Sequence, residues 1–125
     1  MQKNNLYNKK LGKKGEDIAV AYLIGKGYEI IHRNFSFGRQ GEIDIIATCN
    51  NILVFIEVKT RTNYKFGNPI EQISQQKRKK WYNAAQGFLY IKNISDKECR
   101  FDVIIIDLTK DNNKDEYITH IENAI

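Results

Sequence analysis

Two acidic side chains on neighbouring predicted strands are the strongest candidates for chemistry in this 125-residue chain. The segments Glu42–Thr48 and Ile52–Lys59 are rich in β-branched residues, and they flank Asn50-Asn51. Asparagine tolerates the positive φ that tight hairpin turns require, so this pair predicts a hairpin between the two segments. In the register that such a turn sets, Asp44 lies opposite Glu57.

A divalent cation would explain why these two acids face each other. Opposed Cβ atoms in an antiparallel pair lie about 4.5 to 5.5 Å apart, so two ionised carboxylates would repel each other. Mg²⁺ accepts one or two carboxylates together with waters and phosphate oxygens. Lys59, on the same face as Glu57, could hold an attacking water or stabilise charge on a phosphate. The alternative is a salt bridge of Lys59 with Glu57 or Glu42; we favour the metal site because the charges converge at one strand end.

The two faces of this predicted hairpin differ in character. The face opposite the acids is continuously apolar and must be covered by a helix. It comprises Ile43, Ile45, Ala47, Ile52, Val54, Ile56 and Val58. On the face that carries the acids, the residues near the turn are apolar (Ile46, Leu53 and Phe55), so a cleft is expected only at the far end.

The remaining segments predict an α/β protein in the order α-β-β-β-α-β-β, with a mixed four- to five-stranded sheet flanked by helices. Apolar spacing and turn residues define the elements that accompany the hairpin. They are a helix over Leu11–Leu23, a strand over Tyr28–Asn34, a polar loop over Thr60–Asn68, a helix from Pro69 to about Leu89, a strand over Arg100–Leu108 and a short edge strand within Tyr117–Ile125. We expect one domain over residues 1–125, with flexible segments at about 1–7 and 110–116.

Several charged side chains outside the hairpin are further candidates. Glu16 lies at the border of the first helix's apolar stripe, where it could reach the site or simply pair with Lys13 or Lys14. Lys77 falls in the middle of the second helix's apolar stripe. Either its side chain extends into the cleft toward a phosphate or an active-site carboxylate, or the helix is rotated and Lys77 is an ordinary surface residue.

The overall charge and composition set broad limits. A net charge of +5 is compatible with a polyanionic partner, although lysine runs such as 77–80 are usually solvated surface. No stretch resembles a membrane span or a signal peptide, so we expect a cytoplasmic protein with no membrane partner. Cys49 and Cys99 are then expected to be plain thiols.

Four motifs resemble those of one bacterial family. They are Gly15-Glu16, Gly41 to Ala47, Phe55 to Arg61 and Arg100 to Val103. Over nearly its whole length the chain is similar to the YraN family. That resemblance implies the restriction-endonuclease-like fold of the PD-(D/E)xK superfamily and a distant similarity to archaeal Holliday junction resolvases.

The resemblance also implies roles for individual residues. Asp44 matches the metal-binding aspartate, Glu57 and Lys59 match the (D/E)xK pair, and Glu16 matches the acid of the first helix. Ile43 stands where the superfamily's nominal proline would precede the aspartate. The basic residues that we take as candidate nucleic-acid contacts are Arg61, Lys77, Arg39 and Lys13.

These expectations combine into a hypothesis about function. The chain would hydrolyse phosphodiester bonds in DNA, possibly branched, with Mg²⁺ or Mn²⁺ held by Asp44, Glu57 and Glu16. A symmetric four-way junction would suit a homodimer. Two other classes stay open: a module that binds nucleic acid or a partner protein without cutting, and an interaction protein that does not bind nucleic acid.

Overall fold

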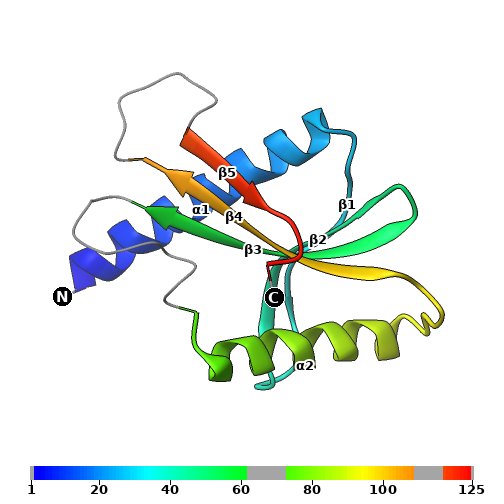
Figure 1. The fold of residues 1–125 in the computed structure, drawn as a ribbon. Helices are drawn as coiled ribbons and strands as arrows, with labels where there is room; N and C mark the ends of the chain where they lie inside the picture. Colours follow the sequence, from blue (N-terminus) through cyan, green and yellow to red (C-terminus); the bar gives the residue numbers. More distant parts are fainter. Residues whose placement is uncertain (1, 62–72, 109–116, 125) are drawn as a thin grey trace.

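The computed structural model describes residues 2–61, 73–108 and 117–124. Five strands form one sheet between two helices (Figure 1). In chain order the elements are α1 (Gln2–Gly25), β1 (Glu29–Ser36), β2 (Glu42–Cys49), β3 (Ile52–Arg61), α2 (Gln75–Ile91), β4 (Cys99–Asp107) and β5 (Ile118–Ile121). This mixed α/β arrangement confirms the predicted order α-β-β-β-α-β-β, which is the order expected for the restriction-endonuclease-like fold.

The sheet is mixed because its strands are joined in two different ways. β1, β2 and β3 follow one another as antiparallel neighbours. β3 and β4 are parallel, and the connection between them carries α2, as a crossover between parallel strands requires. β5 pairs with β4 in antiparallel orientation at the edge of the sheet.

The hairpin between β2 and β3 has the predicted register. Asn50 and Asn51 adopt positive φ values of 51° and 66°, and Thr48 pairs with Leu53. The paired register ends at Ile45 opposite Ile56. Beyond that point β3 continues beside β4 alone, as far as Arg61, which pairs with Asp107.

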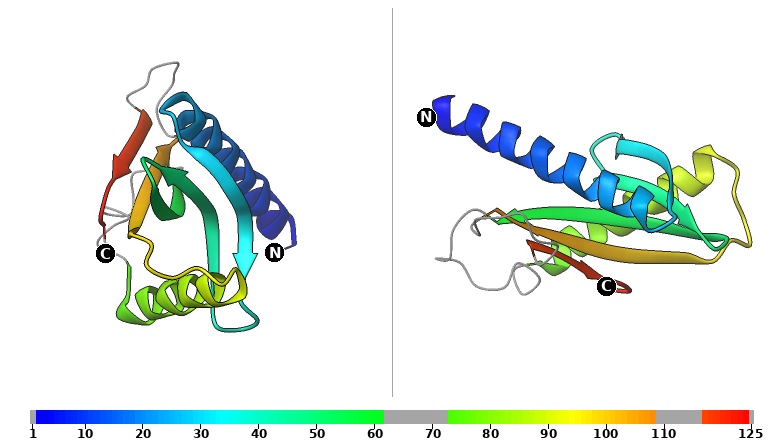
Figure 2. Two further views of the ribbon diagram at one scale, coloured as in Figure 1. Left: turned by 90° about the vertical axis from the view of Figure 1, so that its right-hand side faces the viewer. Right: turned by 90° about the horizontal axis from the view of Figure 1, so that it is seen from above.

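Each face of the sheet buries its own apolar cluster, so the molecule has three layers (Figure 2). The buried cluster under α1 contains Ala19, Leu23, Ile45, Ala47, Val54, Ile56, Ile104 and Ile106. The cluster under α2 contains, among others, Ile46, Leu53, Phe55, Trp81 and Phe88. The expectation that a helix covers the apolar face of the hairpin is therefore confirmed.

Ile43 corrects one detail of that expectation. We predicted it on the face covered by α1, but it packs in the cluster under α2, together with Phe35, its partner on β1. Ile43 lies beyond the last pair of the β2–β3 ladder. The alternation that pairing with β3 imposes therefore no longer fixes its direction, and Ile43 lies on the same face as Phe35 of β1.

Two helix boundaries also differ from the prediction. α2 begins at Gln75 and not at Pro69, because Ser74 is extended and caps the helix, with its Oγ accepting a hydrogen bond from the N–H of Lys77 (3.1 Å). Pro69 and the expected loop after Arg61 lie outside the described residues. α1 begins at Gln2 and not at Leu11, because no glycine or proline interrupts the chain before Gly12. The expected flexibility of residues 1–7 stays a prediction. The second expected flexible segment, 110–116, is not among the described residues.

Two glycines allow the helices to approach the sheet closely. A Cβ on Gly15 of α1 would collide with the hydroxyl of Thr60 on β3, and a Cβ on Gly41 would collide with the backbone carbonyl of Lys80 on α2. Both glycines belong to the motifs found in the sequence. They hold the helices against the part of the sheet where β2 and β3 separate.

Among the described helices, none combines the length and the apolar character needed to cross a membrane.

Candidate active site

Asp44 lies where β2 and β3 separate, one residue beyond the last pair of their ladder. Its Oδ2 accepts a hydrogen bond from the backbone N–H of Val58, at 2.8 Å. The carboxylate thus takes the place of a ladder carbonyl and ties β2 to β3. This contact fixes the side chain of Asp44 beside Glu57. The hairpin register had predicted that the two residues are a directly opposed pair, but the ladder ends before Asp44.

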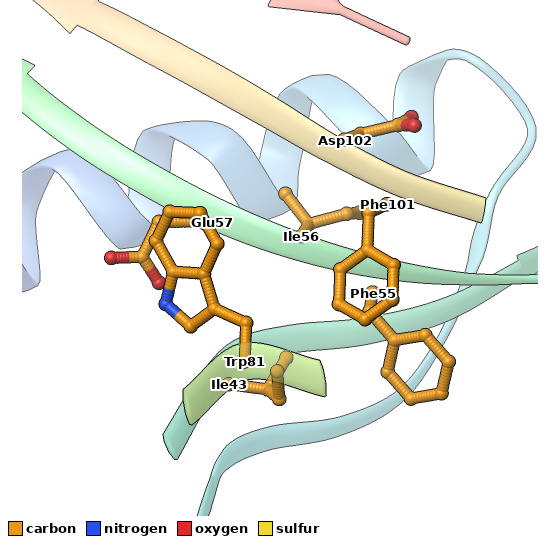
Figure 3. A pocket seen from close by; sticks show the side chains of 7 residues that line it. All are labelled: Ile43, Phe55, Ile56, Glu57, Trp81, Phe101 and Asp102. Carbon is orange, nitrogen blue, oxygen red and sulfur yellow. The ribbon is translucent and has the colours of Figure 1, made fainter. Parts of the chain in front are cut away.

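Glu57 occupies the border between dry core and solvent (Figure 3). On one side its side chain lies beside Trp81 and, with Ile43 and Phe55, lines a space with no room for a water molecule. On the other side it lines an open cavity of about 270 Å³. Burial, followed by the charge of Asp44 and a hydrogen bond with it, raises the pKa of Glu57 to about 8. Without a cation the carboxyl group of Glu57 is therefore mostly protonated at neutral pH.

Two lysines flank this pair of acids. Nζ of Lys59 lies 3.6 Å from Oε2 of Glu57, and Nζ of Lys77 lies 4.0 Å from the same oxygen. Both ammonium groups also lie about 6 Å or less from the centre of the Trp81 ring, at 6.0 and 5.8 Å. Burial and the neighbouring Lys77 lower the pKa of Lys59, against the opposing effect of Glu57. Of the two alternatives for Lys77, the structure shows the one in which its side chain enters the cleft.

The cavity beside Glu57 is lined by acids, lysines and one aromatic ring. Its lining consists of Glu42, Asp44, Glu57, Lys77, Lys80 and Trp81. The sequence analysis did not single out Trp81 and Lys80 as site residues. Their positions three and four residues after Lys77 place all three on one side of α2, and this spacing was the signal available in the sequence.

The oxygen atoms of the acid pair suit a hard divalent cation. Mg²⁺ and Mn²⁺ bind carboxylate oxygen, and Asp44 uses only one of its oxygens to accept the Val58 bond. Among the residues that the structure describes, no group of three histidine, cysteine, aspartate or glutamate side chains could enclose a metal. A cation at this site would need water or phosphate oxygen to complete its coordination.

Glu16 is not drawn into this cleft. Its Oε1 accepts hydrogen bonds from Nε of Arg33 at 3.0 Å and from Nδ2 of Asn34 at 3.1 Å, while α1 packs on the opposite face of the sheet. Arg33 also binds Asp17, at 2.7 Å. Glu16 is therefore paired, as one alternative supposed, but with Arg33 in place of Lys13 or Lys14.

The other predicted basic contacts lie apart from the cavity lining. Arg61 ends β3, where its carbonyl accepts the N–H of Leu108. Arg39 is exposed in the turn between β1 and β2, and Lys13 is exposed on α1. The structure thus brings Asp44, Glu57, Lys59 and Lys77 together. Arg61, Arg39 and Lys13 lie outside this group.

A buried polar network that sequence reasoning missed lies under α1. Asp102 is 1% exposed and binds Arg100 through two bonds of 2.9 Å. It also contacts Nε2 of His120 at 2.7 Å, while Nδ1 of that ring lies 3.1 Å from the hydroxyl of Tyr22. The signal in the sequence was an acid inside an apolar strand, with an arginine two residues earlier on the same face. The network joins β4, β5 and α1.

Fold and site together define a small mixed α/β protein whose cleft pairs two carboxylates with two lysines at the point where two strands diverge. The family model described as "Uncharacterised protein family UPF0102" matches residues 15–106, and the chain belongs to this family. This is the YraN family that the motifs indicated.

Curated relatives extend the similarity over most of the chain. A UPF0102 protein of Clostridium novyi is 45% identical over 118 residues, which is 94% of this chain and 97% of the relative. One from Clostridium perfringens is 44% identical over 110 residues, covering 88% and 89% of the two chains. One from Clostridioides difficile is 42% identical over 117 residues, covering 94% and 97%.

Proposed function

We propose that the protein is a metal-dependent nuclease that hydrolyses phosphodiester bonds in DNA. The observation that carries the proposal is the Asp44–Glu57 pair, two carboxyl groups that repel each other in a cleft also lined by lysines. Burial and the charge of Asp44 raise the pKa of Glu57 to about 8, so the pair is costly to ionise without a cation. Such an arrangement is more typical of a functional site than of a structural ion pair.

Each residue of the cleft has a defined part in this proposal. Asp44 and Glu57 would hold Mg²⁺ or Mn²⁺, which acts as a Lewis acid on the phosphate. Lys59 positions the attacking water and stabilises the charge that develops on the phosphate oxygens. Lys77 and Lys80, on the opposite wall of the cavity, bind the phosphates on either side.

The substrate is inferred by analogy. Branched DNA follows from the resemblance to Holliday junction resolvases. A four-way junction has two-fold symmetry, which a homodimer would match. Arg61, Arg39 and Lys13, which lie outside the cavity lining, would then contact the phosphates of the longer arms of the substrate.

Metal binding and cleavage can be tested together with one pair of variants. Calorimetric titration with Mn²⁺ and cleavage of linear and four-way DNA are compared for wild type, Asp44→Asn and Glu98→Gln. Glu98 is an exposed acid outside the cleft, so Glu98→Gln loses the same charge without touching the site. We expect Asp44→Asn to lose Mn²⁺ binding and cleavage, and Glu98→Gln to retain both. Equal behaviour of all three proteins on every substrate would refute the proposal.

A second candidate function is binding of nucleic acid without cleavage. The position of Glu16 favours this function. Arg33 and Asn34 hold Glu16 outside the cleft, so the acid that was expected as a third metal ligand does not line the cavity beside Asp44 and Glu57. This function predicts DNA binding that falls steeply with salt, since each phosphate contact releases counterions, but no cleavage in Mn²⁺. An interaction protein that does not bind nucleic acid predicts no such salt dependence.

A further inference from the structure

The outward side of α2 carries an exposed stripe of basic and aromatic side chains. Tyr82 and Tyr90 are 52% and 83% exposed, so both rings are accessible to a ligand. At about 100° per residue, the exposed side chains of Arg78, Lys79 and Gln86 fall on the same side of the helix as the two tyrosines. The helix contains four basic residues and no acid. This stripe therefore combines ring faces with positive charge.

Beside Tyr90 the surface is hollowed. The hollow measures about 360 Å³ and is lined by Gln86, Leu89, Tyr90, Asn93 and Ile94. Backbone bonds from Asn93 to Tyr90 and from Ile94 to Leu89 close the end of α2 and fix its walls. Within the part of the chain that the structure describes, the amides of Gln86 and Asn93 have no hydrogen-bond partner. The hollow thus offers an aromatic face together with two free amide groups.

We propose that the hollow at Tyr90 and the ring of Tyr82, eight positions earlier on the same side of α2, bind unpaired nucleobases, so that the preferred ligand carries a single-stranded DNA segment next to the cleft. Base stacking on an aromatic side chain needs a base that has left its own stack. Amide side chains can bind the exposed edge of such a base. Arg78 and Lys79 supply the charge that the accompanying phosphates require.

The distance between hollow and cleft fits one continuous strand. Trp81 points to the opposite side of α2 from Tyr90, but Lys80, which also lines the cleft, is exposed. Lys80 lies about 80° from Tyr90 around the helix and ten positions before it, which is about 15 Å along the helix axis. That length corresponds to roughly four stacking steps of about 3.4 Å. A strand whose phosphate occupies the cleft could therefore place a nearby unpaired base in the hollow. The inference rests on the proposed function in this respect, because it assigns the cleft to nucleic acid.

Binding of oligonucleotides without metal tests the inference separately from cleavage. Affinities for a single-stranded oligonucleotide and for a duplex of the same length are measured in EDTA by fluorescence anisotropy, over a range of salt concentrations. The proteins are wild type, Tyr90→Ala, Tyr90→Phe and Ile24→Ala. Ile24 is 57% exposed on α1 and serves as the control for loss of an exposed apolar side chain.

The expected result has three parts. Wild type binds the single strand more tightly than the duplex, and Tyr90→Ala weakens single-strand binding by roughly 5- to 100-fold without changing the salt slope. Tyr90→Phe and Ile24→Ala stay close to wild type. If Tyr90→Ala matches Ile24→Ala while wild type still binds DNA, the inference is wrong and the proposed function survives. If wild type binds neither oligonucleotide, both are wrong.

Discussion

The side chain of Asp44 accepts a hydrogen bond from the backbone of Val58, with Oδ2 and N 2.8 Å apart. This bond lies just past the point where the β2–β3 ladder ends. Asp44 consequently has a structural task. Its side chain accepts the hydrogen bond of the Val58 N–H, which no backbone carbonyl of β2 accepts beyond the end of the ladder. It also has the chemical task proposed above. The two tasks can be separated by the choice of substitution.

Asp44→Ala and Asp44→Asn should differ in stability although both remove the charge. Alanine leaves the N–H of Val58 without its acceptor, which costs about 1 to 3 kcal/mol. Asparagine keeps a carbonyl oxygen at that position, so its unfolding free energy should stay within about 1 kcal/mol of wild type. Urea denaturation of both variants without metal measures the difference. If the two substitutions destabilise equally, the Val58 bond has no energetic importance.

Glu57 should make the metal-free protein less stable as the pH rises. Its pKa is raised from 4.5 to about 8, first by burial and then by Asp44, so between these values the folded state holds a proton that the unfolded state has released. The contribution is therefore fully present below about pH 4.5 and is lost as the pH rises through 8.

Substitution of Glu57 by glutamine, which cannot ionise, should remove this loss. In EDTA, Glu57→Gln should melt several degrees above wild type at pH 8 and close to it at pH 5, since 1 kcal/mol shifts the Tm of a domain this size by roughly 3 to 6 °C. Glu98→Gln, with an exposed acid, should show no such difference. A lower Tm for Glu57→Gln than for wild type at pH 8 would mean that the carboxylate stabilises the fold through its lysines.

The parts of the site that could be predicted were those set by local rules. The asparagine turn fixes the β2–β3 register, and period-two alternation then places Asp44, Glu57 and Lys59 together. The order of the elements along the chain followed from apolar spacing and turn residues. For Lys77 the sequence left two alternatives, a side chain that extends into the cleft or a helix rotated so that Lys77 lies on the surface. Both follow from its place in the apolar stripe of α2, where an ammonium group could not stay buried.

The parts that could not be predicted depend on contacts between distant segments. Arg33 binds Glu16 from a strand that begins after the helix ends, and no spacing rule connects the two. His120 reaches Asp102 only because β5 pairs with β4. Where β2 leaves β3 is set by the packing of α2 and by the pairing of β3 with β4, so the ladder could not be known to stop before Asp44.

Asp102 should contribute to stability at neutral pH and cease to do so in acid. Burial opposes its ionisation, but hydrogen bonds from His120, Arg100 and the N–H of Asn123 lower the pKa of Asp102 below its ordinary 3.8. A group with a lowered pKa stabilises the fold above its unfolded value, and that stability is lost as the pH falls through the folded value. Stability should therefore decline below about pH 4.

Asp102→Asn should remove this pH dependence, because asparagine does not ionise. At pH 7 it removes the buried charged partner of the half-buried Arg100, which keeps its ion pair with the exposed Glu122, and we expect a loss of about 1.5 to 3 kcal/mol. The difference in Tm from wild type should narrow as the pH is lowered from 5 to 3. Asp17→Asn is the matched control, because Arg33 also lowers the pKa of Asp17 but this acid is exposed. A gap that stays constant from pH 7 to pH 3 would exclude titration of Asp102 as the cause.

Gly41→Ala should destabilise the protein and disturb the cleft together. A Cβ at this position would meet the backbone carbonyl of Lys80, which cannot rotate away as a side chain could, so α2 must shift from β2. Such overpacking costs about 1 to 3 kcal/mol. Gly12→Ala, with open space around the added methyl group, should instead stabilise α1 by about 0.5 to 1 kcal/mol. Urea denaturation of the two variants should therefore give changes of opposite sign.

Because Lys80 and Trp81 line the cavity, Gly41→Ala should also weaken DNA binding, whereas Gly12→Ala should not. A Gly41→Ala protein as stable as wild type would show that α2 can move from the sheet freely.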